Sequence, residues 1–549
     1  MRVCLVGVPT ANEFDDRSMD EANALRTIAE HAPLGVLSLA AVLEERGLRP
    51  EVVDLNRLYY NFRHMNGQNE NDFSRFAASY FPEHQFDFVG FGSVCSSYPL
   101  TLRIACEVKR RLPESVVAFG GPQASAVDVA TLQAYPRIDL VLRGEAEQTL
   151  PQLLQAIDQG GPLDEVPGLT FRRGGKILRN PDAAGITDLD SLPFPAFHLL
   201  PDMETCRFMP LELGRGCPFA CTFCSTNDFF RRRFRLKSPA RMLEDMRRVK
   251  ATYGIDTFEL VHDMFTVDRK RVAAFCEALL ASPDKFYWGC SARTDCIDEE
   301  LIELMASAGC RGVFFGIETG SARMQKIIDK RLDLTDSVAR VRACDKAKIK
   351  TAVSLIVGFP EETREDLRST VGFFLDSLQY DHADPQLVIL APLAGTPIHQ
   401  QHKENLYLEG EDSDMAYRGW DQGPEERTMI AEHQDIFPNF YSVPTPHLDQ
   451  EFVKELRDFL LNGIRVMRRL LVDLHQGTGK VFEVFMEWRK WRTNRKGPFS
   501  RDDRAAYYAS GSFPRDFLEF LEAQITPADC EAPGAGAAPE GNDGALTYS

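Results

Sequence analysis

Short apolar runs alternate with amphipathic stretches twice along this chain, and that alternation limits the folds open to it. In residues 1–158 the apolar runs are Arg2–Val8, Glu51–Leu55, Asp87–Ser93, Val116–Gly120 and Ile138–Leu142. Helical spacing lies between them over Leu34–Arg46 and Leu100–Arg111. Buried strands separated by helices are typical of a parallel sheet with helices on both faces. We therefore predict a doubly wound, Rossmann-like α/β domain over residues 1–158, with its ligand beyond the carboxyl ends of the strands.

A second alternation, with a longer repeat, runs through residues 206–400. Its candidate strands are Met209–Gly214, Thr257–His262, Trp288–Ser291, Gly312–Gly316, Thr351–Gly358 and Gln386–Leu390. The candidate helices between them include Ser238–Tyr253, Arg269–Leu280, Glu299–Ala308 and Glu365–Leu378. Six such units suit a complete or partial (β/α) barrel, whose site lies at the carboxyl ends of the strands.

Breakers and composition divide the remainder. Residues 159–205 are rich in Pro and Gly and form a predicted connector, with a short hairpin over Leu169–Arg179. Residues 401–525 are predicted to be mainly helical, with an amphipathic helix over Glu451–Leu474. A basic, aromatic run from Trp488 to Lys496 could contact an anion, but a solvated helix face with two docked Trp rings is the favoured interpretation. Gly, Ala and Pro make up 13 of the residues 526–549, a composition typical of disorder.

Charge and cysteine content exclude several classes of protein. The chain carries 63 Lys and Arg against 81 Asp and Glu, a net charge of −18, which argues against a sequence-independent nucleic-acid binder. No apolar run approaches the roughly 20 residues of a membrane span. The amino terminus lacks the basic lead and cleavage site of a signal peptide, so we expect a cytoplasmic protein. Its 13 cysteines are an odd number, and a disulfide framework is not expected there.

Three of those cysteines form one dense group, Cys217, Cys221 and Cys224. They lie on a predicted loop after the strand Met209–Gly214, where Gly214 and Gly216 let the chain wrap around a ligand. Zinc sites usually need four ligands, and no partner pair follows at a suitable spacing. Cubane iron–sulfur clusters normally use four thiolates, so three thiolates would leave one iron open to a substrate. Arg231, Arg232 and Arg233 follow closely, and a surface ion-pair network is favoured for them over neutralisation of cluster or substrate charge.

The spacing Cys-x-x-x-Cys-x-Phe-Cys resembles the signature of radical S-adenosylmethionine (SAM) enzymes. The resemblance implies that Cys217, Cys221 and Cys224 are catalytic metal ligands of a [4Fe–4S] cluster whose open iron binds SAM. It further implies reductive cleavage of SAM to methionine and a 5′-deoxyadenosyl radical. Each of three further residues resembles a family contact to SAM: Asp263 to the amine, Arg293 to the carboxylate and Glu318 to the ribose. A structural ion pair at the barrel mouth is the alternative for Asp263 and Arg293.

Three segments of the first domain, Pro33–Ala40, Gly120–Ser125 and Gly144–Glu147, resemble the cobalamin-binding domain that precedes many radical SAM domains. The resemblance implies bound cobalamin. The Asp-x-His-x-x-Gly motif that supplies a histidine to cobalt is absent, and Gln123 stands where the family often has His. We therefore expect backbone and small polar groups to hold the corrin. The expected contacts are Ser93, Ser96, Thr101, Gly120, Gly121, Gln123, Gly144 and Glu145.

Together the two resemblances, over roughly residues 1–400, imply a cobalamin-dependent methyltransferase. Its substrate would be an unactivated carbon of a small molecule, a lipid or a peptide. An electron donor such as flavodoxin or ferredoxin would be its partner. The alternatives are a radical rearrangement or cyclisation enzyme with or without cobalamin, a methylthiotransferase, and a non-catalytic cobalamin or redox sensor. A methylthiotransferase would need three more cluster cysteines in the first domain, where Cys4, Cys95 and Cys106 lack suitable spacing.

Overall fold

The computed structural model describes residues 1–10, 20–65, 72–83, 85–408 and 422–525. The predicted disordered tail, 526–549, lies outside this range. The chain divides into two compact units, Met1–Leu461 and Asn462–Ser549. In the described part of the chain no single helix is long and apolar enough to cross a membrane. Only the bent pair α1 (Glu21–Glu30) and α2 (Leu34–Glu45) passes that test of length and composition, with a bend of 68°.

The first unit begins with a seven-stranded sheet in the order β2-β1-β3-β4-β5-β6-β7. Its strands are β1 (Val3–Gly7), β2 (Glu51–Asp54), β3 (Phe88–Phe91), β4 (Val116–Gly120), β5 (Leu140–Leu142), β6 (Leu169–Arg173) and β7 (Lys176–Arg179). The pairs among β1 to β5 are parallel, which confirms the predicted α/β class. The predicted hairpin is β6 and β7, and it pairs antiparallel with β5. The connector therefore extends the sheet of the first domain.

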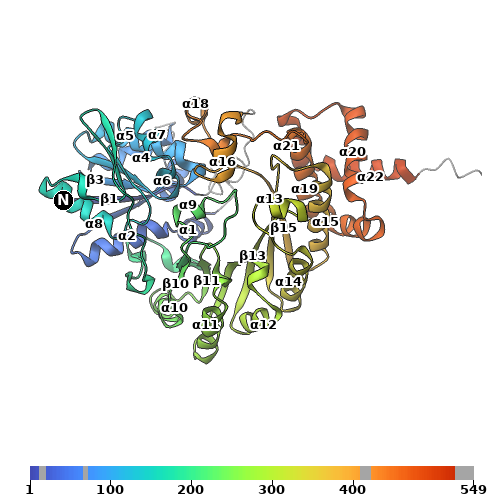
Figure 1. Ribbon diagram of the computed structural model, residues 1–549, viewed down its shortest axis with the longest axis horizontal. Helices are drawn as coiled ribbons and strands as arrows, with labels where there is room; N and C mark the ends of the chain where they lie inside the picture. The colour runs from blue at the N-terminus through green and yellow to red at the C-terminus, as the bar shows by residue number, and fades with distance from the viewer. Residues whose placement is uncertain (11–19, 66–71, 84, 409–421, 526–549) are drawn as a thin grey trace, which may run out of the picture. The chain divides into compact units, whose positions relative to one another are not determined.

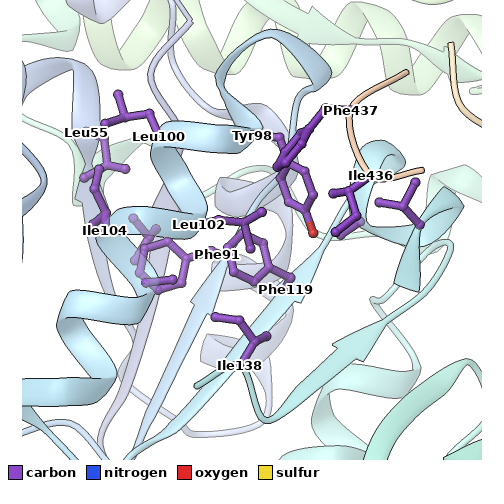
Figure 2. Close-up of a cluster of buried hydrophobic side chains, with 14 of the residues drawn as sticks. Leu55, Phe91, Tyr98, Leu100, Leu102, Ile104, Phe119, Ile138, Ile436 and Phe437 are labelled. Carbon is purple, nitrogen blue, oxygen red and sulfur yellow. The ribbon is translucent and has the colours of Figure 1, made fainter. Parts of the chain in front are cut away.

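Helices cover both faces of this sheet. Besides α1 and α2, they are α3 (Leu55–Met65), α4 (Phe73–Ser79), α5 (Tyr98–Arg111), α6 (Pro122–Ala126), α7 (Asp128–Ala134) and α8 (Thr149–Gln159). On one face Phe91 and Phe119 stack beneath Tyr98 of α5 (Figure 2). The same apolar cluster includes Ile436 and Phe437, which lie far along the chain. Burial of these side chains ties residues 436–443 to the first sheet.

The second sheet has six strands, all parallel, in the order β15-β14-β13-β12-β11-β8 (Figure 1). They are β8 (Met209–Glu212), β11 (Thr257–Val261), β12 (Tyr287–Ala292), β13 (Cys310–Glu318), β14 (Lys350–Val357) and β15 (Ala383–Ile389). The connecting helices include α10 (Pro239–Tyr253), α11 (Arg269–Ala281), α12 (Glu299–Ser307), α13 (Ala322–Ile327), α14 (Leu334–Lys346) and α15 (Arg364–Leu378). Because β8 and β15 are the two edges, the barrel is partial, one of the two predicted forms.

Helices follow the second sheet. They are α16 (Pro397–His402), α18 (Pro424–Glu432), α19 (Gln450–Thr478), α20 (Val481–Lys496), α21 (Arg501–Ala509) and α22 (Ser512–Ile525). The amphipathic helix predicted over Glu451–Leu474 is α19, which has a break at Met467. In the second unit Trp488 is fully buried and packs against Phe513 and Phe517. Arg495 and Lys496 pair with Glu519 and Asp516. Trp491 packs against Phe520, so both Trp rings of this run are docked, as the favoured interpretation predicts.

Candidate active site

The three clustered cysteines lie on a loop that a small ribbon closes. The ribbon pairs β9 (Gly214–Arg215) antiparallel with β10 (Arg235–Leu236), and the loop between them carries Cys217, Cys221, Cys224 and the short helix α9 (Thr226–Phe229). A Cβ atom at Gly216 would lie 2.1 Å from the carbonyl oxygen of Arg233, and φ at Gly216 is +78°. Only glycine therefore lets the two arms of the loop approach this closely.

Asp263 fastens the same loop from the end of β11. Its carboxylate accepts hydrogen bonds from the backbone N–H of Gly216 at 2.9 Å and from the hydroxyl of Thr226 at 3.0 Å. These two bonds hold the loop before and after the three cysteines. The structure thus gives Asp263 a positioning role in the loop. Its predicted contact with the SAM amine stays a prediction.

The thiols of the cluster loop lie close enough to influence one another. Burial raises the pKa of Cys217 to about 11, and the neighbouring thiols of Cys224 and Cys221 add to the rise. In the described residues no three His, Cys, Asp or Glu side chains converge on the position of a single metal ion. The donor set, three thiols around a glycine-bordered loop, fits an iron–sulfur cluster with one open iron better than a single ion.

Arg293 lies at the end of β12, buried beneath the cluster loop. Its guanidinium donates two hydrogen bonds to Asp295, at 2.9 and 2.8 Å, and one to the backbone carbonyl of Lys330. It also stacks 3.7 Å from the ring centroid of Phe219. The ion-pair alternative is thus present, with Asp295 as partner. Among the described residues Nη1 has no acceptor, and a buried donor of that kind fits the carboxylate of SAM.

Glu318 ends β13 in a left-handed backbone conformation, with φ +70°, beside an irregularity in the pairing with β14. Its Oε1 accepts a hydrogen bond from Nζ of Lys330 at 2.8 Å, and both side chains are buried. A Cβ atom at Gly316 would collide with this pair, so glycine makes its space.

Sequence reasoning missed two residues near the cluster loop, Lys330 and Cys296. Lys330 and Arg293 both oppose the rise that burial causes in the pKa of Cys221. Cys296, on the turn after β12, lies near enough to Cys217 for the two thiols to interact electrostatically. Neither residue belongs to a motif, and only the folded chain brings them to the loop.

A cavity of about 390 Å³ lies at the carboxyl ends of the strands of the first sheet. Gly121 has φ +91°, and a Cβ atom there would lie 3.1 Å from the backbone N of Ser93. Ser93 donates to the carbonyl of Gly120 at 2.7 Å and accepts from the N–H of Ala124 at 2.9 Å. Backbone atoms and small side chains therefore form this part of the wall. A broad, flat ligand such as a corrin can lie close against it.

Five of the predicted corrin contacts line this cavity: Ser93, Gly120, Gly121, Gly144 and Glu145. The other three do not. Thr101 is completely buried inside α5, where its hydroxyl donates to the carbonyl of Ser97. Ser96 lies on the turn before α5, outside the cavity lining, and its carbonyl accepts from Gln422. Gln123 donates to the carbonyl of Ile436 at 2.8 Å and faces a second cavity. The structure places these three outside the lining of this cavity, with Thr101 held by its own helix and Gln123 by the carbonyl of Ile436. Their contact with a corrin stays a prediction.

Arg215 joins the corrin cavity to the cluster loop. This buried side chain stands two residues before Cys217 and donates to Glu145 at 2.9 Å, to Glu147 at 2.6 Å and to Glu212 at 2.8 Å. Arg235 of β10 also donates to Glu145. Glu145 therefore lines the cavity while its carboxylate is bound by two arginines. Phe229 and Phe230 of the cluster loop also line this cavity. Its wall therefore combines residues of the first α/β region with residues of the second.

Comparison with known proteins supports these assignments of the two regions. Residues 24–154 match the B12 binding domain, and residues 211–374 match the Radical SAM superfamily. An uncharacterized methyltransferase of Pyrococcus horikoshii is 31% identical over 327 residues, 59% of this chain and 70% of the relative. An anaerobic magnesium-protoporphyrin IX monomethyl ester cyclase of Cereibacter sphaeroides is 28% identical, and the match spans 56% of this chain and 51% of the cyclase.

Two solved structures share the fold over most of the chain. The cobalamin-dependent SAM radical enzyme OxsB, with aqua-cobalamin bound, has a TM-score of 0.65 at 15% identity, over 95% of this chain and 81% of OxsB. The radical SAM methyltransferase TsrM from Kitasatospora setae has a TM-score of 0.61 at 21% identity, over 83% of this chain and 88% of TsrM. The chain belongs to the family of radical SAM enzymes that carry a B12-binding domain and use a [4Fe–4S] cluster, SAM and cobalamin.

Proposed function

We propose that this enzyme transfers a methyl group to an unactivated carbon of a small molecule, a lipid or a peptide. The observation that carries the proposal is the shared cavity wall: Glu212, Arg215, Phe229 and Phe230 of the radical SAM region line the cavity at the end of the B12-binding sheet. A corrin held there would face the cluster loop. The two cofactor sites can then serve one substrate without its release between them.

The chain's own residues position and shield the reacting groups. Bound cofactors would supply the electron for SAM cleavage and the carrier of the methyl group. Cys217, Cys221 and Cys224 would hold the cluster, and the free Nη1 of Arg293 would bind the SAM carboxylate. Glu318, oriented by Lys330, would accept from the ribose. The apolar rings of Phe229 and Phe230 would exclude water from the space between the cofactors.

Two features of the setting belong to the same proposal. A cluster with an open iron needs a reducing, oxygen-poor compartment, such as the cytoplasm, and an electron donor such as flavodoxin or ferredoxin. Cyclisation is the second candidate reaction, because the named relatives include the anaerobic cyclase as well as methyltransferases.

The test is the product pattern from SAM. Protein reconstituted anaerobically with iron, sulfide and hydroxocobalamin is incubated with SAM, a chemical reductant and a metabolite extract. Methyl transfer predicts paired S-adenosylhomocysteine and 5′-deoxyadenosine, whereas 5′-deoxyadenosine without S-adenosylhomocysteine would replace the proposal by rearrangement or cyclisation.

Two controls accompany that test. The triple substitution of Cys217, Cys221 and Cys224 by Ala should abolish 5′-deoxyadenosine formation, and persistent cleavage would refute the cluster assignment. Substitution of Cys344, a buried core cysteine on α14, by Ala should leave cleavage intact. Complete loss of corrin on gel filtration would contradict the cobalamin site.

A further inference from the structure

A second cavity, of about 550 Å³, adjoins the corrin cavity. The two share Val94, Pro122, Gly144 and Phe229 in their walls. Ser225, the residue directly after Cys224, also lines the second cavity. A molecule bound here would therefore lie beside both cofactor sites, which is where a substrate has to be.

Three arginines of this wall meet at one carboxylate. Asp182 pairs with Arg143 at 3.1 Å, with Arg231 at 3.0 Å and more loosely with Arg179 at 3.8 Å. A second carboxylate, the buried Asp128, accepts from Arg143 and from Nε of Arg179. Asp182 and Asp128 thus bind three guanidinium groups between them, which places a cluster of planar donors on this wall.

The outer two guanidiniums keep donors for a ligand. Arg179 and Arg231 are each half-exposed, whereas Arg143 is buried. Each guanidinium has five N–H donors, and the one ion pair that Arg231 makes within the described residues is with Asp182. A planar fork of this kind binds the oxygens of carboxylate or phosphate in pairs.

One acidic group opposes this charge. Asp228 of α9 lines the same cavity, and its carboxylate has no hydrogen bond or ion pair within the described ranges. It interacts electrostatically with Arg231, Arg179 and Asp182, and burial raises its pKa. Asp228 and Arg231 line the same cavity and carry opposite charges. Removal of one charge or the other should therefore change anion binding in opposite directions.

We propose that the second cavity is the substrate site and that Arg231 and Arg179 bind an anionic group of the substrate, a carboxylate or a phosphate. The inference rests on the proposed function and names the chemical class of its substrate. Asp128 holds Arg179 through its Nε, while Asp182 bridges all three arginines. The neutral remainder of the molecule would extend toward Val94 and Phe229, where the two cavities meet.

The experiment measures anion binding by isothermal titration of the reconstituted enzyme at low ionic strength. Inorganic phosphate and acetate are the two probes, and their relative affinities distinguish phosphate from carboxylate substrates. Arg231→Gln and Arg179→Gln should each weaken binding of the preferred anion about tenfold, because each removes charged donors. Asp228→Asn should strengthen it, because a repulsive carboxylate is lost. Arg232→Gln is the matched control, an exposed neighbour that lines neither cavity and should leave the affinity unchanged.

The opposite results would overturn the inference. These are wild-type affinity in Arg231→Gln and Arg179→Gln, weaker anion binding in Asp228→Asn, or binding of methylammonium in place of the anions. Iron content and retained cobalamin are measured on the same samples. Loss of either in the wild type would count against the proposed function, whereas loss of anion binding with both cofactors retained would count against the substrate class alone.

Discussion

At the scale of single residues, the buried ion pair of Lys330 and Glu318 is expected to contribute strongly to stability. Both side chains are buried and their charged atoms lie 2.8 Å apart. Lys330→Met would leave the carboxylate buried without its partner, so we expect the free energy of unfolding to fall by about 3 kcal/mol. Urea denaturation of the apoprotein measures it. The double variant Lys330→Met with Glu318→Gln should recover most of the loss, and an equally unstable double variant would show that packing, and not charge, is responsible.

Glu362 gives a prediction about pH. It is buried after β14, where its Oε2 accepts from the N–H of Gly358 at 2.6 Å, and burial raises its pKa to about 8. The unfolded carboxyl titrates near 4.3, so between these values the folded chain binds the proton that the unfolded chain has lost. This contribution to stability is full below about pH 4 and decreases as pH rises toward 8.

Comparison with Glu362→Gln isolates that contribution, because the amide keeps the acceptor oxygen and removes the titration. The free energy of unfolding of the wild type should fall relative to the variant by about 1.4 kcal/mol per pH unit between pH 5 and 8. Urea unfolding at pH 5.5, 6.5 and 7.5 measures the difference. Parallel pH curves for the two proteins would contradict it.

At the scale of elements, the cluster loop depends on the space left by its glycines. Gly216→Ala would place a methyl group 2.1 Å from the carbonyl of Arg233 at φ +78°, a collision with backbone and an unfavourable left-handed conformation. We expect iron and sulfide to remain at background after anaerobic reconstitution, while the B12-binding region still binds hydroxocobalamin.

Gly175→Ala is the matched control for that variant. Gly175 has φ +76° in the β6–β7 turn, and nothing lies within 4 Å of the added Cβ. Its cost should be only the left-handed conformation, about 1 kcal/mol, with normal iron content. Normal iron content in Gly216→Ala would show instead that the ribbon can open without losing the cluster.

Elements differed in how well the sequence predicted them. The strands were identified within a few residues, because short apolar runs between turns leave few alternatives. Two helices between β13 and β14, α13 and α14, were not among the helices identified from the sequence. α14 is mostly polar, with buried side chains at Ser337, Val341, Ala343 and Cys344, so its apolar stripe is narrow. Its helical form is set by packing over β14 more than by pattern.

At the scale of the first unit, Arg215 couples the B12-binding region to the cluster loop. Arg215→Met would leave Glu147 on the cavity wall without a cation and Glu145 with Arg235 alone. The two carboxylates would then repel each other and reorient, so we expect affinity for hydroxocobalamin to fall about tenfold, or 1.4 kcal/mol. Equilibrium dialysis monitored by corrin absorbance measures this.

Arg57→Met is the control for Arg215→Met. Arg57 pairs with Asp202 at 2.5 Å and so links the first α/β region to the connector before β8, but its side chain is partly exposed and lies outside the cavity. Its loss should change cobalamin affinity little, since exposed pairs contribute at most about 1 kcal/mol. Equal effects of the two variants would mean that any ion pair that anchors the first α/β region, and not the carboxylates on the wall, decides the affinity.

The sequence by itself determined the two α/β regions and the cluster loop, and its resemblance to radical SAM and cobalamin-binding proteins indicated the cofactor class. Those properties depend on local patterns: apolar runs set the strands, and the spacing of Cys217, Cys221 and Cys224 sets the loop chemistry. Only the tertiary structure decided which polar side chains reach each site. Arg215 and Glu145 are 70 positions apart, and Arg231 and Asp182 meet from separate segments. Such contacts depend on how the two sheets pack, which no local pattern contains. Thr101 bonds to Ser97 within its own helix, whereas Gln123 bonds to the distant Ile436, so only the folded chain shows where either side chain lies.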